Sequence, residues 1–386
     1  MAGMKASRLR GLRVAHLIES DGPGGAERVL ADLALGMQGA GAANLVMLPA
    51  DREGWLARQL EGSGIAIEYF RLTRPFSPAC ARSLAAVLRY HSIDIAHSHE
   101  FSLAVYGSWA SWLAGVQHVI TMHGSRYYAD RWRRRVAMRA AVAASGRLVA
   151  VSHHLADELS RELGAPRSSI DVVPNGVRHA AAGHPTLRTE LRLTTNDRLL
   201  IAVGNLYPVK GHRHLIDALA LLAPRYPSLH VAICGRGDLE QALAAQAREL
   251  GVADRVHLLG LRGDVGNVLA SADVFVHPSL SEGLPLALLE AMFAARPIVA
   301  SDVGEVGSVL ADGAGVAVPA GSPAALAGAI DCLLERPSLA RAMADRAYAK
   351  ACADFDVSRM VARYASLYEQ LLPAPSIGNR ACPRCA

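Results

Sequence analysis

The sequence predicts an α/β protein built from two Rossmann-like domains, each a doubly wound parallel sheet. Three observations support this prediction. The chain has 386 residues, which is too long for a domain with a single hydrophobic core and suits two domains. Short runs that are apolar from end to end alternate with longer helical patterns, as expected for strands covered by helices on both faces. This alternation forms two series, separated by the turn-forming segment Pro174-Asn175-Gly176.

The first series predicts an N-terminal domain over residues 1–176. Its expected strands are residues 12–18, 44–48, 65–69, 93–96, 118–122 and 148–151. Its clearest helical patterns are residues 27–37, 78–90 and 154–163.

The second series predicts a C-terminal domain over residues 177–356. Residues 177–198 are rich in turn formers and suit a linker that leads into it. Its expected strands are residues 199–203, 229–233, 256–258, 274–276, 298–300 and 315–318.

The end of the chain has a different pattern. Met360, Tyr364, Leu367 and Leu371 recur at helical spacing, with Asp356 as the expected N-cap and no strand after them. We therefore expect a terminal helix over residues 357–372 and a flexible tail over residues 373–386.

Charge and composition exclude several classes of protein. The net charge of +5 lies in residues 1–175, which carry 20 Lys and Arg against 15 Asp and Glu, while the remainder is balanced. Only three basic residues are lysines, so the abundance of arginine reflects genomic bias and does not predict nucleic-acid binding. Residues 12–18 form too short an apolar run for a signal peptide or a membrane span. These features predict a cytoplasmic protein.

The six cysteines do not form a disulfide framework. Four of them, Cys80, Cys234, Cys332 and Cys352, are scattered through apolar segments and are expected to be reduced and buried. Cys382 and Cys385 make a lone Cys-x2-Cys, and a zinc site would need two further ligands nearby.

Loops that follow strands are the first place to look for chemistry, because ligands of doubly wound sheets bind there. Residues 21–27 form a glycine-rich loop that opens a helix, although Gly24 and Gly25 could instead serve only a tight turn. A dinucleotide fingerprint would need glycine where Glu27 stands, so a nicotinamide enzyme is disfavoured. His123, followed by Gly124, ends another strand and could reach a ligand; His97 and His99 are weaker candidates.

The second domain carries stronger signals. Lys210 precedes a helix after the strand 199–203, which suits a diphosphate anchor, although the spacing of a P-loop is absent. Glu282 lies on a Gly/Pro-containing loop after the strand 274–276, and Glu290 follows about two helical turns later on an apolar helix. A carboxylate there needs a partner, which sugar or ribose hydroxyls would supply.

These motifs, in this order and spacing, resemble the retaining glycosyltransferases of GT-B fold, the large family 4 type also described as glycosyl transferases group 1. The resemblance runs from Gly24 to about Tyr368. Its components are Gly24-Gly25-Ala26-Glu27, His123-Gly124, Val151-Ser152, Val173-Pro174-Asn175-Gly176-Val177, Lys210-Gly211, Pro278-Ser279, Glu282-Gly283-Leu284-Pro285 and Glu290. It implies two domains that face each other across a cleft, with the terminal helix crossing back to the first, acceptor-binding domain.

The resemblance also implies residue roles. Lys210 would bind the donor diphosphate, Glu282 the hydroxyls of the hexose and Glu290 the ribose. His123 would touch the transferred sugar, and Gly25 would bring backbone amides near the diphosphate and the acceptor. The segment Gly283-Leu284-Pro285 would complete the donor site.

One position departs from the family pattern. The family usually has an arginine five residues before the lysine, where this sequence has Asn205. Asparagine donates one neutral hydrogen bond, whereas arginine donates two parallel, charged ones. Neutralisation of the phosphates would therefore fall on Lys210, with Arg236 as a candidate substitute for the arginine.

The implied reaction is transfer of a hexosyl group from a UDP- or GDP-sugar to a glycan or lipid-linked acceptor. We expect no cofactor and no metal, because Lys210 and helix dipoles can neutralise the diphosphate. The segment Asp354-Phe355-Asp356 has the spelling of an Asp-x-Asp metal motif but is better explained as a helix cap. Two alternatives stay open: a GT-B-fold sugar-nucleotide epimerase, and a non-catalytic sugar-nucleotide-binding relative, which Asn205 favours.

A membrane contact is also predicted. Arg131, Arg133, Arg134, Arg135 and Arg139 lie on an expected helix with apolar residues interleaved. Such a helix suits peripheral contact with an anionic membrane on its cytoplasmic face, although the apolar residues could equally face the protein core.

Overall fold

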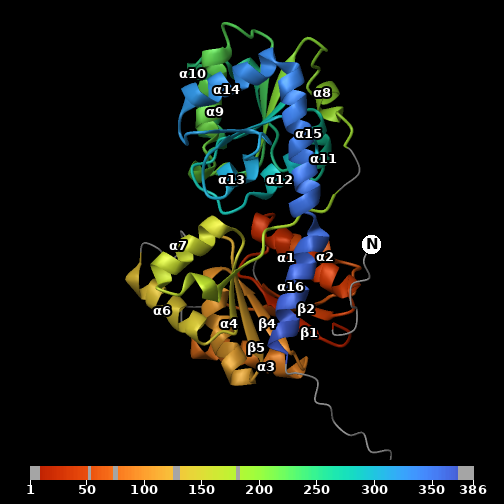
Figure 1. Cartoon of the computed structure of the whole chain (residues 1–386), viewed down its shortest axis with the longest axis vertical. Coiled ribbons are helices and arrows are strands. Elements are labelled where there is room, and N and C mark those ends of the chain that lie inside the picture. The colour runs from red at the N-terminus through yellow and green to blue at the C-terminus, as the bar shows by residue number, and fades with distance from the viewer. Residues whose placement is uncertain (1–8, 51–53, 73–76, 125–130, 180–182, 373–386) are drawn as a thin grey trace, which may run out of the picture.

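A computed structural model of the chain describes residues 9–50, 54–72, 77–124, 131–179 and 183–372. The described residues form two halves, one above the other in Figure 1. Each half holds one sheet whose strands all run parallel, with helices on both faces.

The first sheet has seven strands in the order β3-β2-β1-β4-β5-β6-β7. The strands are β1 (Arg13–Leu17), β2 (Ala43–Pro49), β3 (Ala66–Phe70), β4 (Ile95–His99), β5 (Gln117–Met122), β6 (Arg147–Ala150) and β7 (Ile170–Val172). Five of these agree with the expected strands to within one residue at each end, β4 only overlaps the expected residues 93–96, and β7 was not predicted. The chain winds outward in opposite directions from β1 and β4, so the switch point of this sheet lies between them.

Two layers of helices cover the first sheet. The helices and 3₁₀ turn of this half are α1 (Gly25–Gly39), α2 (Trp55–Leu60), α3 (Pro78–Tyr90), α4 (Glu100–Ala114), α6 (Trp132–Ala143), α7 (His153–Leu163) and η1 (Arg167–Ser169). Helices α1 and α2 pack on one face, and α3, α4, α6 and α7 on the other. Ser152 caps α7 by accepting a hydrogen bond from Leu155 N.

The second sheet has six strands in the order β10-β9-β8-β11-β12-β13. The strands are β8 (Arg198–Val203), β9 (Leu229–Cys234), β10 (Val256–Leu258), β11 (Val274–His277), β12 (Ile298–Ser301) and β13 (Val316–Val318). All six were predicted to within two residues. The switch point of this sheet lies between β8 and β11.

The helices of the second half also form two layers. They and two 3₁₀ turns are α8 (Thr186–Glu190), η2 (Pro208–Lys210), α9 (His212–Leu222), α10 (Glu240–Glu249), η3 (Ala253–Arg255), α11 (Val265–Ala270), α12 (Leu286–Phe293), α13 (Val306–Leu310), α14 (Pro323–Glu335) and α15 (Pro337–Asp354). Helices α9, α10 and α14 pack on one face, and α11, α12, α13 and α15 on the other.

The last helix, α16 (Val357–Leu371), leaves the second half and packs on the first beside α1, as the run of blue in Figure 1 shows. Asp356 caps it, accepting a hydrogen bond from Ser358 N at 2.8 Å. Tyr364 and Tyr368 are fully buried in the first half. The two passages of the chain between the halves are bonded to each other, because Val177 donates to Phe355 O at 2.9 Å. The predicted fold class, including the helix that crosses back, is confirmed.

The structure corrects two smaller expectations. Cys80 and Cys234 are buried, but Cys332 is half-buried and Cys352 is exposed because it lies on the outer side of α15. The strand expected at residues 93–96 runs instead from Ile95 to His99, so that three polar residues belong to its buried end. Cys382, Cys385 and the expected tail lie outside the described residues. No helix in the described part of the chain is long and apolar enough to span a membrane.

Candidate functional site

The loops after β8 and β11 meet at the switch point of the second sheet. Gly211, the N-cap of α9, has a positive φ of 63°, and a Cβ at this position would collide with the carbonyl of Pro278. Leu280 N donates to Val209 O at 2.8 Å. These contacts hold Lys210 against the loop that carries Glu282, 72 residues later in the chain.

Lys210 and Glu282 form an ion pair at this point. Lys210 Nζ donates to Glu282 Oε1 at 2.7 Å, and His277 Nε2 lies 3.2 Å from the same oxygen. The side chains of Lys210 and Glu282 are 27% and 10% exposed. Burial alone would raise the pKa of the Glu282 carboxyl, but the neighbouring His277 and Lys210 side chains hold this pKa at about 2. Glu282 is therefore a carboxylate that only accepts hydrogen bonds.

Asn205 and Arg236 lie on adjacent loops after β8 and β9. Leu206 N donates to Arg236 O at 2.9 Å, and a Cβ at Gly235 would collide with the carbonyl of Gly204. This close approach needs glycine at position 235. The backbone of Arg236 is therefore next to the Asn205 loop, and its role as a substitute for the family's arginine stays a prediction.

Beside the switch point of the first sheet, β4 ends in His99, and His123 directly follows β5. His99 Nδ1 lies 3.1 Å from His123 Nε2, and the rings stack with their centroids 5.4 Å apart. Burial lowers the pKa of His123 to about 4, so its ring is neutral near pH 7. His123 N donates to Glu100 Oε1 at 3.2 Å.

Glu100 itself is strained. It has a φ of 65°, a left-handed conformation that is unfavourable for a residue with a Cβ and that recurs at functional sites. Burial, together with the charge of Glu19, raises the pKa of its carboxyl to about 8. The carboxyl is therefore mostly protonated at pH 7.

The two switch points face each other. A Cβ at Gly283 would lie 2.6 Å from His123 O, so these loops touch across the two halves. Asn175 Nδ2 donates to Leu284 O at 2.8 Å. Gly25 begins α1 opposite Leu286, the first residue of α12, which follows Pro285. The structure thus brings Gly25, His123 and the segment 282–285 together.

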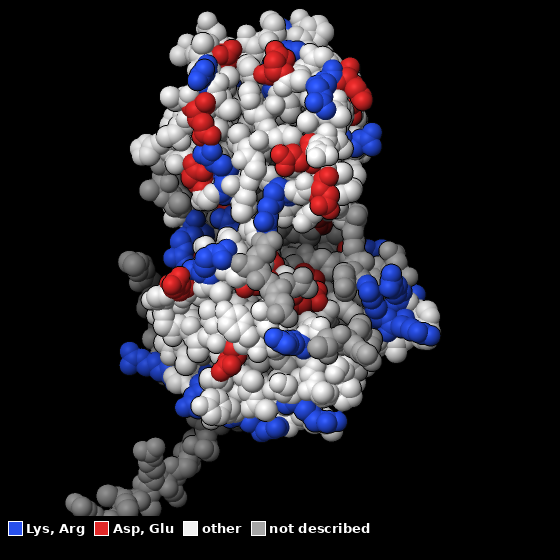
Figure 2. Space-filling view, turned by 180° about the vertical axis from the view of Figure 1, so that it is seen from behind, with Lys and Arg blue, Asp and Glu red and all other residues white. Residues whose placement is uncertain are grey.

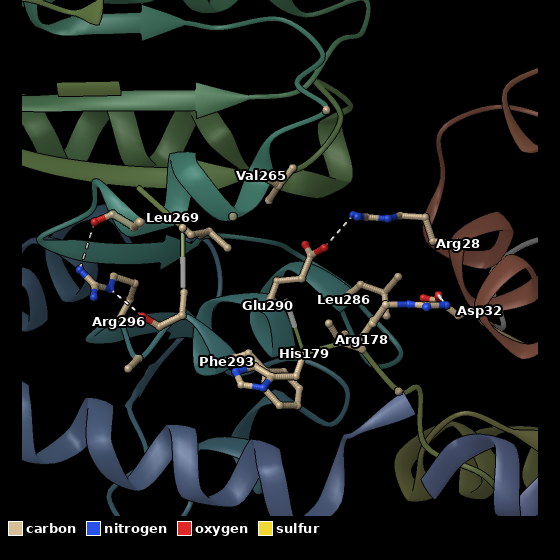
Figure 3. A pocket seen from close by; sticks show the side chains of 18 of the residues that line it. Arg28, Asp32, Arg178, His179, Val265, Leu269, Leu286, Glu290, Phe293 and Arg296 are labelled. Atoms are coloured by element: carbon tan, nitrogen blue, oxygen red, sulfur yellow. Dashed lines mark hydrogen bonds and ion pairs between the residues drawn. The ribbon is translucent and has the colours of Figure 1, made fainter. Parts of the chain in front are cut away.

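Glu290 lies apart from that group, in a cavity of about 840 Å³ between the halves. Arg28 reaches it from α1, and its Nη1 lies 2.7 Å from Glu290 Oε1, as Figure 3 shows. Burial raises the pKa of the Glu290 carboxyl, and Arg28 opposes this shift. A second ion pair, between Arg178 and Asp32 at 3.2 Å, lies on the same side of the cavity. Lys210 and Glu282 are not among the residues that line it.

One group of histidines among the described residues has the composition of a metal site. His16, His97 and His99 are buried, with ligand nitrogens within 4.8 Å of one another. Ligand atoms of tetrahedral zinc lie about 3.4 Å apart, and no carboxylate belongs to the group. Both ring nitrogens of His97 already bond to hydroxyls, those of Tyr368 and Thr121, each at 2.7 Å. The arrangement fits a hydrogen-bonded network better than a metal centre.

Sequence reasoning missed several partners in these sites. Arg28, His277 and Glu100 were not singled out, and His99 was only a weak candidate. The nearest sequence signal was position: His99 ends a buried strand, Glu100 directly follows it, and Arg28 directly follows the glycine-rich loop. Their partners are distant in the chain, so spacing could not reveal them.

Comparisons with known proteins agree with this geometry. The family model described as "Glycosyl transferases group 1" matches residues 184–350, and that described as "Glycosyltransferase Family 4" matches residues 23–181. A phosphatidyl-myo-inositol mannosyltransferase of Mycobacterium leprae is 30% identical, over 92% of this chain and 96% of the relative. An Escherichia coli UDP-Gal:alpha-D-GlcNAc-diphosphoundecaprenol alpha-1,3-galactosyltransferase is also 30% identical, but over 57% of this chain and 61% of that protein.

Solved structures show the same architecture. The chain superposes on Anabaena HepE in complex with UDP-glucose with a TM-score of 0.82, at 25% identity, over 93% of this chain and 100% of the other. WaaG, a glycosyltransferase of lipopolysaccharide biosynthesis, gives a TM-score of 0.72 at 19% identity, over 92% and 99% of the two chains. These neighbours confirm the GT-B arrangement of the two sheets.

Proposed function

The chain belongs to the glycosyltransferase family described as glycosyl transferases group 1, and from this membership we propose its reaction. The protein transfers a hexosyl group from a nucleotide diphosphate sugar, a UDP- or GDP-sugar, to a hydroxyl of a glycan or lipid-linked acceptor. The configuration at the anomeric carbon is retained, and the pathway is cell-envelope or exopolysaccharide biosynthesis. A UDP-sugar is the first donor to test, because the E. coli relative is named for UDP-Gal and the HepE structure holds UDP-glucose.

The main support for the proposal is the ion pair of Lys210 and Glu282, which lies across the two halves from His123. A diphosphate needs a cation, and a hexose needs hydroxyl acceptors; both lie at the switch point where doubly wound sheets bind ligands. When the donor binds, Lys210 is shared between Glu282 and the diphosphate. Glu282, with a pKa of about 2, accepts hydrogen bonds from the hexose at any pH near neutrality.

The nucleoside part of the donor enters the cavity that Glu290 lines. Its volume of about 840 Å³ is in the range of small-molecule sites. Glu290 accepts hydrogen bonds from the ribose hydroxyls, in place of or together with its present partner Arg28. Because Arg28 comes from the other half of the molecule, ribose binding and the contact between the halves depend on the same carboxylate.

The proposed chemistry takes place on one face of the sugar. The bond between the anomeric carbon and the diphosphate breaks, the acceptor oxygen bonds to the same face of that carbon, and its proton passes to the diphosphate. The Glu282 carboxylate is already engaged by Lys210 and His277, which disfavours it as a nucleophile. Lys210 stabilises the leaving diphosphate, so the proposal needs no metal and no cofactor.

The test is turnover of the purified chain. UDP-, GDP- and ADP-sugars are screened by thermal shift, and the stabilising donors are assayed with glycan and lipid-linked acceptors. Lys210→Ala should weaken nucleoside diphosphate binding, and Glu282→Ala should lower turnover by about tenfold or more with nucleotide binding retained. Conversion of the donor without acceptor would indicate the epimerase, and binding without turnover the non-catalytic relative.

A peripheral contact with anionic membranes completes the proposal. Helix α6 exposes Trp132 and Val136, which are 64% and 54% exposed, so these apolar side chains do not face the core. Figure 2 shows basic side chains gathered on one side of the half that carries the first sheet. Exposed aromatic and basic residues together suit an anionic interface.

Liposome sedimentation tests this contact. The wild-type chain should sediment with anionic but not zwitterionic vesicles, and less so in high salt. Replacing Arg133, Arg134 and Arg135 with serine should weaken the binding. Equal sedimentation of the two proteins would exclude the α6 surface as the contact.

A further inference from the structure

His123 is held by two consecutive residues, His99 at the end of β4 and Glu100 at the start of α4. His99 contacts the ring, with its Nδ1 3.1 Å from His123 Nε2, and Glu100 accepts a hydrogen bond from the backbone N of His123. Both the ring and the backbone of His123 are therefore fixed where β4 passes into α4. With Nε2 engaged by His99, Nδ1 is the nitrogen of His123 that remains for a ligand.

The environment of His99 decides which nitrogen carries the proton. His99 is fully buried, and its Nε2 has no hydrogen-bond partner among the described residues. A buried N–H without an acceptor is rarer and more unfavourable than a buried lone pair without a donor, so the proton of neutral His99 belongs on Nδ1. That N–H then donates to His123 Nε2, which must be unprotonated.

The rings are neutral for a physical reason. Burial lowers the pKa of His123 to about 4, and burial together with the neighbouring histidines lowers the pKa of His99 well below its usual value. A neutral imidazole carries one proton, and His123 cannot hold it on the nitrogen that accepts from His99. The proton of His123 therefore lies on Nδ1.

We propose that His99 is a positioning residue of the transfer reaction, which fixes His123 as the Nδ1–H tautomer and so makes it a hydrogen-bond donor toward the transferred hexose. This inference rests on the proposed function for the sugar contact, but the tautomer itself is a property of the free protein. It specifies that the hexose presents an oxygen to His123 as acceptor. A sugar that lacks the oxygen at that position should be a poorer donor substrate.

The network behind His99 keeps its ring in place. The ring centroids of His97 and His99 are 4.2 Å apart, and His97 bonds to Tyr368 and Thr121. Thr121 Oγ1 is in turn 3.0 Å from Tyr364 OH. Both tyrosines belong to α16, so the orientation of His123 is supported by the helix that crosses back from the second half.

The tautomer can be measured directly. Nitrogen-15 NMR of histidine-labelled protein distinguishes protonated from unprotonated ring nitrogens, and His123→Gln identifies the His123 signals by their loss. We expect His123 Nδ1 protonated and Nε2 unprotonated at neutral pH. A protonated Nε2 on His123 would overturn the inference.

Two substitutions of His99 test the kinetic consequence. His99→Leu removes the donor, and His99→Asn keeps an amide N–H near the position of Nδ1. We expect kcat to fall about tenfold in the leucine variant with little change in donor Kd, and to recover most of the loss in the asparagine variant. His118→Leu is the matched control: it replaces another buried histidine, one that bonds Ser98 and does not contact His123.

The outcomes separate this inference from the proposed function. Unchanged kcat in His99→Leu would overturn the positioning role, as would an equal loss of kcat in His118→Leu. If His99→Leu fails to fold, the wild-type spectrum and the kcat of His99→Asn decide. If the wild-type chain binds no nucleotide sugar and transfers nothing, the proposed function fails, while the NMR measurement still tests the tautomer.

Discussion

The ion pair of Lys210 and Glu282 should contribute measurably to the stability of the second half. An upper bound on its effect comes from the pKa of the Glu282 carboxyl, which is about 2 in the folded chain against an ordinary value of 4.5, because His277 lowers this pKa more than Lys210 does. A shift of this size corresponds to about 3 kcal/mol. Because the folded pKa is depressed, this stability is present above pH 4.5 and is lost as the pH falls toward 2.

Lys210→Met leaves the Glu282 carboxylate buried with His277 as its remaining partner. We expect the variant to lose about 1–2 kcal/mol of unfolding free energy at neutral pH, because Lys210 supplies only part of the shift. Glu282→Gln should lose less, because the Lys210 side chain is 27% exposed and can be solvated. The double variant should be more stable than the sum of the two losses implies, with a coupling energy of about 1–2 kcal/mol.

The assay is urea unfolding of the four proteins. All four tryptophans, at positions 55, 109, 112 and 132, lie in the first half, so fluorescence would report the wrong part of the molecule. Far-UV circular dichroism, with hydrogen exchange of peptides around β8 and β11, follows the second half instead. Lys350→Met is the control for loss of a lysine, since Lys350 donates to a backbone carbonyl, that of Ser308. A coupling energy below about 0.5 kcal/mol would refute the reasoning.

Four further predictions follow from the sites. Glu290→Gln should weaken UDP binding about tenfold by isothermal titration, while binding of a UDP analogue without ribose hydroxyls should hardly change; equal losses would exclude the ribose contact. Gly283→Ala should lower both thermal stability and turnover, because its Cβ would lie 2.6 Å from His123 O; a variant with wild-type melting temperature and rate would contradict this contact. Unfolding free energy should fall as the pH drops from 6.5 toward 4. Burial lowers the pKa of His16 and His123 to about 4 and that of His118 to about 3, so in this range these histidines bind protons only in the unfolded chain. A flat pH profile in urea titrations would disprove this prediction. EDTA should leave turnover intact, whereas loss of activity that manganese restores would show that a metal is required.

The sequence predicted the fold well because its strands are apolar from end to end and punctuated by turn formers. Prediction failed where polar residues lie inside a strand. The buried end of β4 was not predicted because it contains the polar residues His97 and His99. His97 is buried with hydrogen bonds to Thr121 and Tyr368, and these distant partners cannot be inferred from the local sequence pattern. Strand β7 was missed because its three residues run directly into the turn at Pro174.

The candidate site was predicted one side chain at a time. Family spacing placed Lys210 and Glu282 on loops after strands and Glu290 on the helix that follows, where the structure has them. Neither spacing nor composition could show that Lys210 bonds to Glu282, or that Glu290 bonds to Arg28 from the opposite half. Such pairs depend on how loops from different strands pack, which is decided by distant contacts.

The return of α16 to the first half has a consequence for how the chain is made. The face of the first sheet beside α1 is closed by Tyr364 and Tyr368, and these residues leave the ribosome after both sheets have been synthesised. Until then the part of that apolar face beside α1 is exposed to solvent. The first half therefore cannot complete its folding before the last helix has been synthesised. Shortening the chain before residue 357 would expose this face permanently, and we expect such a fragment to aggregate even though every strand of its sheet is present.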